Sequence, residues 1–275
     1  MKKHNLLDGK NGLIFGALDE NSIAWHVARA CKREGASFTL TNAPIAMRFG
    51  QLDKLAKETG ADVISCDVTD EKDVIKLIQQ TVEKSGKLDF VLHAVGMSPN
   101  IRKGIDYQKL NYKLMQQTLE ISAISLHKIL KTCMEQDALN ERASVIALTY
   151  IGAQRVFSKY SDMNDAKALL ESIARNFGSR LGHKGIRVNT VSQGPTKTSA
   201  GTGIRGFDAM YDFAELLAPL GNPSAQECAD YCVTLFSDLT AKVTMQNLFH
   251  DGGFSTNGIS EQLIWDLAEL KKQME

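Results

Sequence analysis

The sequence lacks any apolar run as long as the ~18 residues that a membrane-spanning helix requires. It also lacks a charge imbalance, because 32 basic residues offset 32 acidic ones and leave no overall field to attract nucleic acid or anionic membranes. The opening residues, MKKHNLLDGKNG, contain neither the apolar stretch nor the cleavage site of a signal peptide. These absences predict a cytoplasmic protein with neither nucleic acid nor membrane among its partners.

Cysteine is scarce, and its pattern does not suggest a disulfide framework. An odd number of cysteines scattered among apolar neighbours is typical of buried, reduced thiols. The five positions are Cys31, Cys66, Cys133, Cys228 and Cys232. The last two stand four residues apart, but His and Cys do not cluster around them, so we expect no metal site.

Short apolar runs alternate with longer segments whose apolar residues recur at helical spacing. The runs are 12–17, 37–41, 62–68, 88–96, 144–150, 186–192 and 243–250, and the helical segments are 22–35, 70–86, 118–136, 166–182 and 224–239. Continuously apolar strands are typical of a parallel sheet covered on both faces. The fold class is therefore predicted as α/β, with residues 1–275 forming a single doubly wound Rossmann-type domain around a seven-stranded, mostly parallel sheet.

Two connections, 97–110 and 193–223, are too long to be tight turns. Long loops that follow the carboxyl ends of strands in open α/β sheets are where ligands bind. We expect 193–223 to form a substrate-binding loop.

The first predicted strand runs into a turn suited to the pyrophosphate of a dinucleotide. Gly16 permits a close backbone approach, and Ser22 and the first helix amides, beginning at Ile23, can donate to phosphate. The usual three-glycine fingerprint is absent, however, and Ser22 is equally well explained as a helix N-cap.

The ends of later strands extend this cofactor site. Asp67, followed by Val68, could bond an adenine amino group, and Gly96 would let the chain pass beside a ribose. The second strand ends without the Asp or Glu that a strict NAD enzyme usually carries to hold both ribose hydroxyls. The residues alone therefore leave NADH and NADPH open.

Tyr160 and Lys167 stand seven residues apart, after the fifth predicted strand. On a continuous helix this spacing places both on one face, roughly 10 Å apart along the axis. A phenol there can donate to an oxygen that gains negative charge, and a nearby ammonium favours that charge. Such pairs also arise by chance, so a functional interpretation of this pair depends on its position after the fifth strand of the predicted sheet.

With that position, the chain from Gly16 to Gly253 resembles the short-chain dehydrogenase/reductase superfamily. Within it, the chain resembles the enoyl-acyl-carrier-protein reductases of bacterial type II fatty-acid synthesis. The resemblance rests on the turn from Gly16 to Ser22-Ile23-Ala24, Tyr150 ten residues before Tyr160, Tyr160-x6-Lys167, and the Gly-Pro-Thr-Lys-Thr run at 194–198.

This resemblance implies reduction of trans-2-enoyl thioesters on acyl carrier protein by a homotetramer that uses NADH, with NADPH not excluded. It implies that Tyr160 donates to the enolate, that Lys167 binds the nicotinamide ribose and that Tyr150 flanks the acyl chain. Further cofactor contacts are implied for Val95, Gly96, Thr196 and Thr198, and substrate contacts for Ser98 and Met163. Met163 is equally well explained as a core residue.

Two alternative functions remain. A ketone or conjugated-carbonyl reductase of this superfamily normally carries a Ser twelve or thirteen residues before the catalytic Tyr, where this chain has Leu148 and Ala147. A catalytically silent dinucleotide-binding redox sensor would not need the intact Tyr150, Tyr160 and Lys167.

Residues 198–212 are expected to form a mobile lid over the acyl chain. Three glycines loosen the segment, and its apolar residues recur at near-helical spacing: Ile204, Phe207, Met210 and Tyr211. A permanently packed helix is the alternative. Lys197 and Arg205 could meet an acidic carrier protein, or could be ordinary solvated charges.

Overall fold

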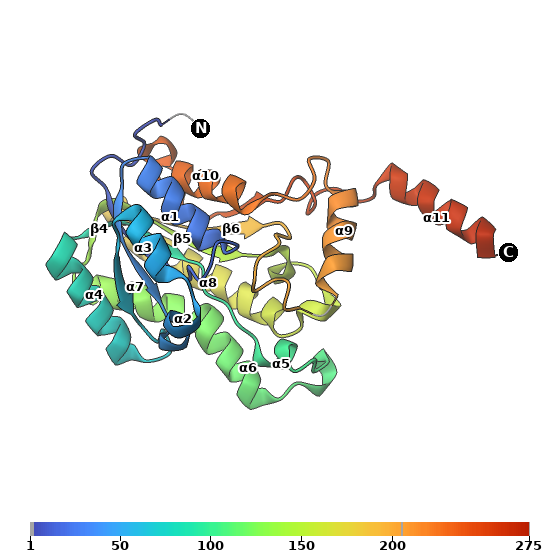
Figure 1. Ribbon diagram of the computed structural model, residues 1–275, viewed down its shortest axis with the longest axis horizontal. Coiled ribbons are helices and arrows are strands. Elements are labelled where there is room, and N and C mark those ends of the chain that lie inside the picture. The colour runs from blue at the N-terminus through green and yellow to red at the C-terminus, as the bar shows by residue number, and fades with distance from the viewer. Residues whose placement is uncertain (1–2, 205, 275) are drawn as a thin grey trace.

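A sheet of seven parallel strands forms the centre of the computed structural model, which describes residues 3–204 and 206–274 (Figure 1). The spatial order is β3-β2-β1-β4-β5-β6-β7. The strands are β1 (Asn11–Phe15), β2 (Ser37–Asn42), β3 (Asp62–Ser65), β4 (Leu88–His93), β5 (Leu139–Thr149), β6 (Arg187–Gln193) and β7 (Asn247–His250). The order reverses between β1 and β4, which creates a crevice at the carboxyl ends of these strands, where α/β folds bind ligands.

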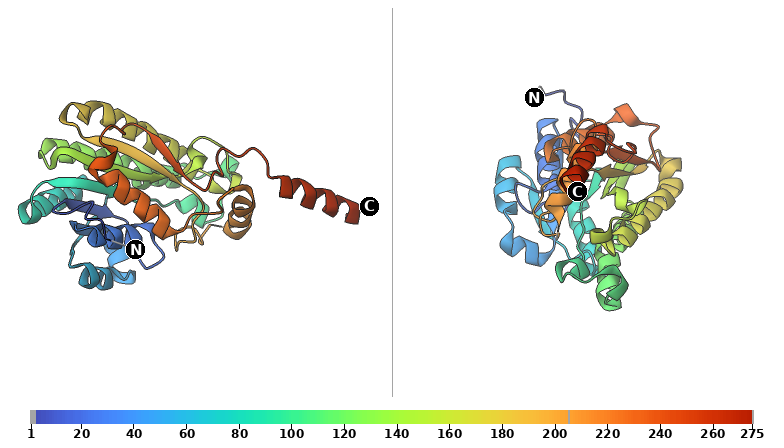
Figure 2. Two further views of the ribbon diagram at one scale, coloured as in Figure 1. Left: turned by 90° about the horizontal axis from the view of Figure 1, so that it is seen from above. Right: turned by 90° about the vertical axis from the view of Figure 1, so that its right-hand side faces the viewer.

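Helices cover both faces of the sheet, which confirms the doubly wound prediction (Figure 2). One layer contains α1 (Ile23–Arg33), α3 (Leu52–Thr59) and α10 (Ala225–Phe236), and the other contains α4 (Glu71–Ser85), α7 (Ser125–Glu135) and α8 (Met163–Leu181). Each layer has its own apolar core. Trp25 and Phe236 are buried in the first, and Leu77 and Leu170 in the second.

Several elements differ from the sequence predictions. Three predicted strands end early, at Phe15, Ser65 and His93, because the chain leaves the sheet there to build the crevice. The predicted helix 118–136 is instead α6 (Tyr112–Leu119), a π-helical turn (Glu120–Ile124) and α7.

Other helices were not predicted as helices at all. They are α2 (Pro44–Phe49), α3, α5 (Pro99–Arg102), α9 (Phe207–Leu217) and α11 (Glu261–Met274). The expected loop 193–223 thus contains a helix, α9, and α11 extends away from the body of the molecule (Figures 1 and 2).

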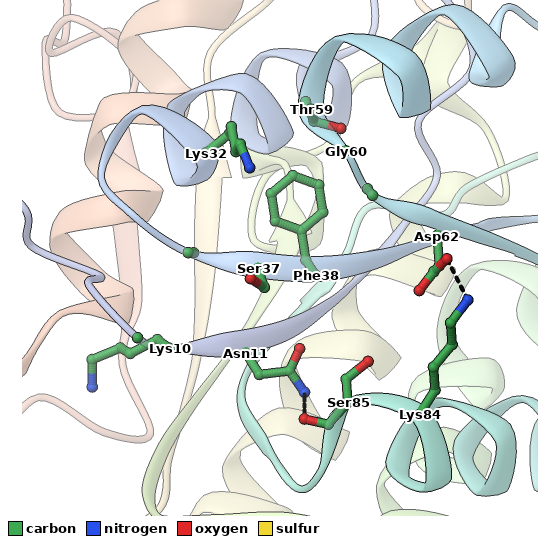
Figure 3. Close-up of a pocket in the computed structure, with 13 residues that line it drawn as sticks. Lys10, Asn11, Lys32, Ser37, Phe38, Thr59, Gly60, Asp62, Lys84 and Ser85 are labelled. Carbon is green, nitrogen blue, oxygen red and sulfur yellow. Dashed lines mark hydrogen bonds and ion pairs between the residues drawn. The ribbon is translucent and has the colours of Figure 1, made fainter.

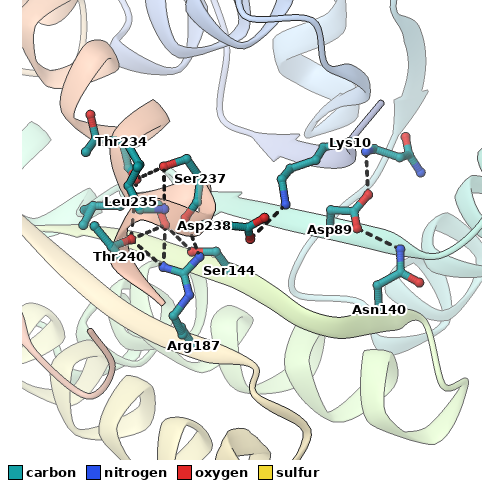
Figure 4. A network of polar contacts seen from close by, with 12 residues as sticks. Lys10, Asp89, Asn140, Ser144, Arg187, Thr234, Leu235, Ser237, Asp238 and Thr240 are labelled. Atoms are coloured by element: carbon teal, nitrogen blue, oxygen red, sulfur yellow. Dashed lines mark hydrogen bonds and ion pairs between the residues drawn. The ribbon is translucent and has the colours of Figure 1, made fainter. Parts of the chain in front are cut away.

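A buried arginine at the amino end of β6 fastens the end of α10 to the sheet (Figure 4). Arg187 donates to the carbonyl oxygens of Leu235 at 2.7 Å and Ser237 at 3.0 Å, and to Thr240 Oγ1 at 2.8 Å. Ser144 Oγ of β5 also donates to the Leu235 carbonyl, at 2.8 Å. These bonds satisfy the carbonyls at the end of α10 and hold that helix on the sheet.

A hollow of about 410 Å³ lies at the same amino edge, between the starts of β1, β2 and β3 (Figure 3). Two of its lysines are already paired, Lys84 with Asp62 at 2.5 Å and Lys10 with Asp238 at 3.3 Å. Because the crevice opens at the opposite, carboxyl edge, we assign this hollow no part in the chemistry.

All five cysteines are buried free thiols, as expected. Burial raises the pKa of both Cys66 and Cys133 to about 12, so these thiols stay protonated at neutral pH. Across residues 3–204 and 206–274, no helix combines the length and the apolar character needed to cross a membrane.

Candidate active site

Gly16 follows β1 and shapes the crevice. Its φ is +95°, and a Cβ at this position would lie only 2.1 Å from the Ala94 carbonyl oxygen beyond β4. Only glycine therefore allows the two strand ends to approach this closely. The turn predicted to receive a pyrophosphate has the backbone shape that this role requires.

Ser22 holds the loop between β1 and α1. Its hydroxyl donates to the Asp19 carbonyl oxygen at 2.7 Å and accepts from the Leu18 amide at 3.2 Å. Ser22 occupies the N-cap position of α1, but its side chain caps no helix amide. The loop is thereby fixed so that α1 begins at Ile23, beside the crevice, and presents the positive end of its dipole.

Three predicted site residues come together at the end of β4. A Cβ built on the exposed Gly96 would lie 3.3 Å from Met163 Cε and 3.7 Å from Lys167 Nζ. Any side chain at 96 would therefore cover the ammonium. Glycine at 96 leaves this side of the largely buried Lys167 uncrowded.

Lys167 is buried and held from one side. Its Nζ donates to the Leu148 carbonyl oxygen of β5 at 2.8 Å. Burial lowers the pKa of Lys167 to about 8, and the carboxylate of Glu171 partly opposes this shift. An ammonium has three protons, so further donors are available to a ribose.

Tyr150 and Tyr160 pack edge to face, with ring centroids 5.0 Å apart. Gly152 lies against both rings, because a Cβ there would be 2.9 Å from Tyr160 Cδ1 and 3.1 Å from Tyr150 Cδ1. Burial raises the pKa of both phenols, and for Tyr150 the neighbouring Tyr160 adds to the shift. Both hydroxyls are therefore neutral hydrogen-bond donors at physiological pH.

The expectation that Tyr160 and Lys167 share one helix face is wrong. Tyr160 ends a short 3₁₀ turn, Ser158–Tyr160, and α8 begins only at Met163, which was expected to lie one turn into the helix. Ser161, with φ +47° and ψ −133°, breaks the chain direction between them. Ring packing against Tyr150 outweighs the helical propensity of this segment.

Asp162 anchors the start of α8, a role that was not predicted from the sequence. Its buried carboxylate accepts hydrogen bonds from Ser98 Oγ at 2.6 Å, Asn100 Nδ2 at 2.9 Å and Thr118 Oγ1 at 2.8 Å. Ser98 Oγ also accepts from the Ile101 amide at 3.0 Å and so caps α5. The contacts that the structure gives Ser98 are thus structural, and its expected contact with substrate stays a prediction.

Gln193 braces the turn that follows β6. Its Nε2 donates to Thr196 Oγ1 at 2.9 Å, and its Oε1 lies 2.7 Å from His250 Nδ1. Thr196 Oγ1 in turn lies 3.0 Å from the Gly194 carbonyl oxygen, and Thr198 Oγ1 accepts from the Gly201 amide at 3.0 Å. The turn predicted to hold the cofactor is therefore rigid up to Thr198.

The loop after β6 reaches across to the loop after β1. Ser199 Oγ donates to Asp19 Oδ2 at 2.5 Å, which bridges the two sides of the crevice. Beyond this contact, the expected lid divides into turns and the start of α9 at Phe207. Lys197 lies 4.4 Å above the Tyr211 ring, and Arg205 falls outside the described residues. Mobility of 198–212 stays a prediction.

Asp67 and Val68 lie just beyond β3, at the same edge of the sheet. Asp67 Oδ1 accepts from the amide of Thr69 at 2.9 Å and from its hydroxyl at 2.7 Å, which fixes the turn. Val68 is buried and Val95, beyond β4, is partly buried. Their expected contacts with the cofactor remain untested.

Comparison with known proteins agrees with this geometry. The family model described as "Enoyl-(Acyl carrier protein) reductase" matches residues 16–255. The chain belongs to this enoyl reductase family. A relative from Rhizobium meliloti (strain 1021), named enoyl-[acyl-carrier-protein] reductase [NADH] 1, is 35% identical over 268 residues, 97% of each chain.

Solved structures of enoyl reductases agree along almost the whole chain. The FabI-NADH complex from Alistipes finegoldii has a TM-score of 0.92 at 54% identity and covers 94% of this chain and 92% of its own. A second FabI structure from the same organism has a TM-score of 0.94 at 49% identity and covers 99% of this chain and 100% of its own. Both the predicted fold and the predicted family are therefore confirmed.

Proposed function

We propose that this enoyl reductase uses NADH to reduce the trans-2 double bond of enoyl thioesters carried by acyl carrier protein, the last reduction of fatty-acid elongation. The observation that carries the proposal is the pair of neutral tyrosines, Tyr150 and Tyr160, at the crevice that also contains Gly96 and Lys167. The names of the relatives support both the reaction and the preference for NADH.

The chain's residues fit a bound dinucleotide. Gly16 lets the ends of β1 and β4 approach closely, and Gly96 leaves the side of Lys167 uncrowded, at the crevice where the strand order reverses. Bound NADH would supply a hydride at this site. Lys167 would bind its ribose, and the amino end of α1 its pyrophosphate. The remaining contacts would come from Ser22, Ile23, Asp67, Val68, Val95, Thr196 and Thr198.

Tyr160 would stabilise the charge that develops on the substrate. As the thioester oxygen gains negative charge, the protonated phenol donates a hydrogen bond to it, and the partly buried surroundings strengthen that bond. Tyr150 would flank the acyl chain, with Met163 on the cofactor side and Ser98 at the rim. The sites of a ketone-reductase serine hold Ala147 and Leu148, which offer no second donor to a carbonyl.

We also propose that the enzyme works in the cytoplasm as a homotetramer. Lys197, and Arg205 eight residues later in the sequence, would contact the acidic carrier protein. Lys197 already stacks on Tyr211 of α9, so binding of the carrier protein at Lys197 would directly affect α9 in the substrate-binding loop.

The proposal is tested by following NADH oxidation with crotonyl and longer trans-2-enoyl thioesters, with NADPH in parallel. We expect turnover with NADH and slower turnover with NADPH. If no enoyl thioester is reduced with either nucleotide, while NADH binds, the redox-sensor alternative is favoured instead.

A further inference from the structure

A buried carboxylate, that of Glu171, lies one turn after Lys167 on α8. Glu171 is only 4% exposed, and it stands four residues after Lys167, a spacing at which side chains on a helix are neighbours. A charged group removed from water costs free energy unless it is paired or hydrogen-bonded. None of the roles assigned to the crevice residues uses this carboxylate.

Three side chains from other parts of the fold donate hydrogen bonds to Glu171. Thr149 Oγ1, at the end of β5, and Asn247 Nδ2, at the start of β7, each donate to Oε1 at 3.1 Å. Gln154 Nε2 donates to Oε2 at 3.4 Å. Thr149 directly precedes Tyr150, and Gln154 follows the short turn after it. The carboxylate therefore holds both ends of the segment that carries Tyr150.

The surroundings of Glu171 favour its ionised form. Burial raises the pKa of this carboxyl group, but the hydrogen bonds from Thr149 and Gln154 and the positive charges of Arg175 and Lys167 oppose the shift. Arg175 Nη1 lies 4.0 Å from Oε2, and the arginine side chain is half exposed. Because each of these neighbours donates a hydrogen bond or carries a positive charge, we expect an anion here at neutral pH.

The same anion acts on Lys167. Burial lowers the pKa of Lys167, and among the described residues Glu171 is the charged neighbour that opposes this shift. His93, at the end of β4, also lies near Lys167, but burial lowers its pKa to about 3, so it carries no charge at neutral pH. Tyr150 and Tyr160 are neutral as well, because burial raises the pKa of both. The protonation of Lys167 above neutral pH therefore depends on Glu171.

We propose that Glu171 is a positioning residue for the cofactor site, where its negative charge keeps Lys167 protonated while its hydrogen bonds hold the Tyr150 segment against α8. One buried group thereby joins the charge that binds the nicotinamide ribose to the tyrosine that flanks the acyl chain. The proposal rests on the role in NADH binding proposed above for Lys167. If the contacts of Glu171 served the fold alone, removal of its charge would not change the pH dependence of NADH binding.

Glu171→Gln removes the charge and keeps the shape of the side chain. Loss of a nearby negative charge disfavours the ammonium, so we expect the pH at which NADH binding is lost to fall by about one unit. NADH should then bind the variant about fivefold more weakly than the wild type at pH 8 and almost equally at pH 6. Fluorescence titration of NADH across this range measures both. An equal loss of affinity at every pH would overturn the proposal.

Two further variants separate the charge from the packing. Thr149→Val removes one hydrogen bond to the carboxylate but keeps the charge, so it should leave the pH of NADH loss where it is in the wild type. Arg175→Met removes the opposing charge at an exposed position and should move that pH upward, which tests the charge even if Glu171→Gln does not fold. A shift in Thr149→Val as large as that in Glu171→Gln, or no upward shift in Arg175→Met, would contradict the proposal.

The protonation of Lys167 can also be followed without NADH. In protein made with isotope-labelled lysine, the Lys167 Cε chemical shift, assigned with Lys167→Met, should titrate at lower pH in Glu171→Gln than in the wild type. Identical titration in the two proteins would overturn the proposal and leave the proposed reaction intact. NADH binding to the wild type without a slope that Lys167→Met removes would instead overturn the role proposed for Lys167.

Discussion

The chemistry of the crevice depends on single residues, chiefly on glycines at positions where a Cβ would not fit. Glycine occupies three such positions. A Cβ at 16 would strike the Ala94 carbonyl beyond β4, a Cβ at 96 would crowd the Lys167 ammonium, and a Cβ at 152 would press on both tyrosine rings. The result is a neutral phenol and a buried ammonium at the edge of one crevice.

Tyr160→Phe removes the donor to the developing enolate and leaves the ring packing against Tyr150 in place. We expect turnover of enoyl thioesters to fall roughly 10²-fold or more, because one preorganised donor is lost. The dissociation constant for NADH should not change, since the hydroxyl is assigned to the substrate. Steady-state kinetics with NADH fluorescence titration measure both, and near-normal turnover would remove Tyr160 from its role.

Lys167 gives the site a pH dependence. Because burial lowers its pKa to about 8, the ammonium is mostly protonated at pH 7 and is lost as the pH rises through 8. NADH binding should therefore weaken between pH 7 and 9.5, by about 30-fold at most, the factor by which the protonated fraction falls. The raised pKa of Tyr160 keeps that phenol from titrating in the same range. Lys167→Met should bind NADH weakly with no such slope, and an equal slope in this variant would assign the titration elsewhere.

At the scale of elements, the site depends on how α5, α6 and α8 are joined. The buried carboxylate of Asp162, just before α8, accepts hydrogen bonds from three side chains of α5, its N-cap and α6. Asp162 also lies two residues from Tyr160. The first turn of α8 and the rim of the crevice are thus held as one unit.

Asp162→Asn tests this coupling. The new side chain has one acceptor oxygen in place of two, so one side of the network loses its acceptor, and an unsatisfied buried group costs about 1–3 kcal/mol. We expect a lower melting temperature, a higher KM and a lower kcat, with NADH affinity retained. Asp53→Asn, the same change at an exposed site on α3, serves as the control and should alter none of these. Loss of stability with unchanged KM and kcat would limit Asp162 to a structural role.

Residues 198–212 are a second element-scale test. Their glycines and the turns before α9 predict a mobile lid, whereas the Ser199–Asp19 bond and the burial of Phe207 predict local order at two points. Hydrogen exchange should slow across 198–212 when NADH and an enoyl analogue bind. Strong protection without ligand, unchanged on binding, would identify a permanently packed segment.

The sequence predicted the elements whose signals are local. Apolar runs located all seven strands, and the Tyr160-to-Lys167 spacing located the catalytic segment. It could not predict the break at Ser161, because that turn depends on contacts with Tyr150 and Gly152 from another element. The hydrogen-bond network of Asp162 could not be predicted for the same reason, since its three donors are 44 to 64 residues away in sequence.

At the scale of the whole molecule, stability and chemistry occupy opposite edges of the sheet. Arg187 fastens α10 at the amino edge, while every catalytic candidate lies at the carboxyl edge. Ala147 and Leu148 on β5 pack in the two apolar cores, and serine at either position would add a donor to a carbonyl oxygen.

The most direct test of the account compares two substrates on the same enzyme. With NADH or NADPH, initial rates are measured for a trans-2-enoyl thioester and for the 3-oxoacyl thioester of equal chain length. Tyr150, Tyr160 and Lys167, without a serine at 147 or 148, predict reduction of the enoyl thioester and almost none of the 3-oxoacyl thioester. Comparable rates on the two substrates would contradict the account and favour a carbonyl reductase.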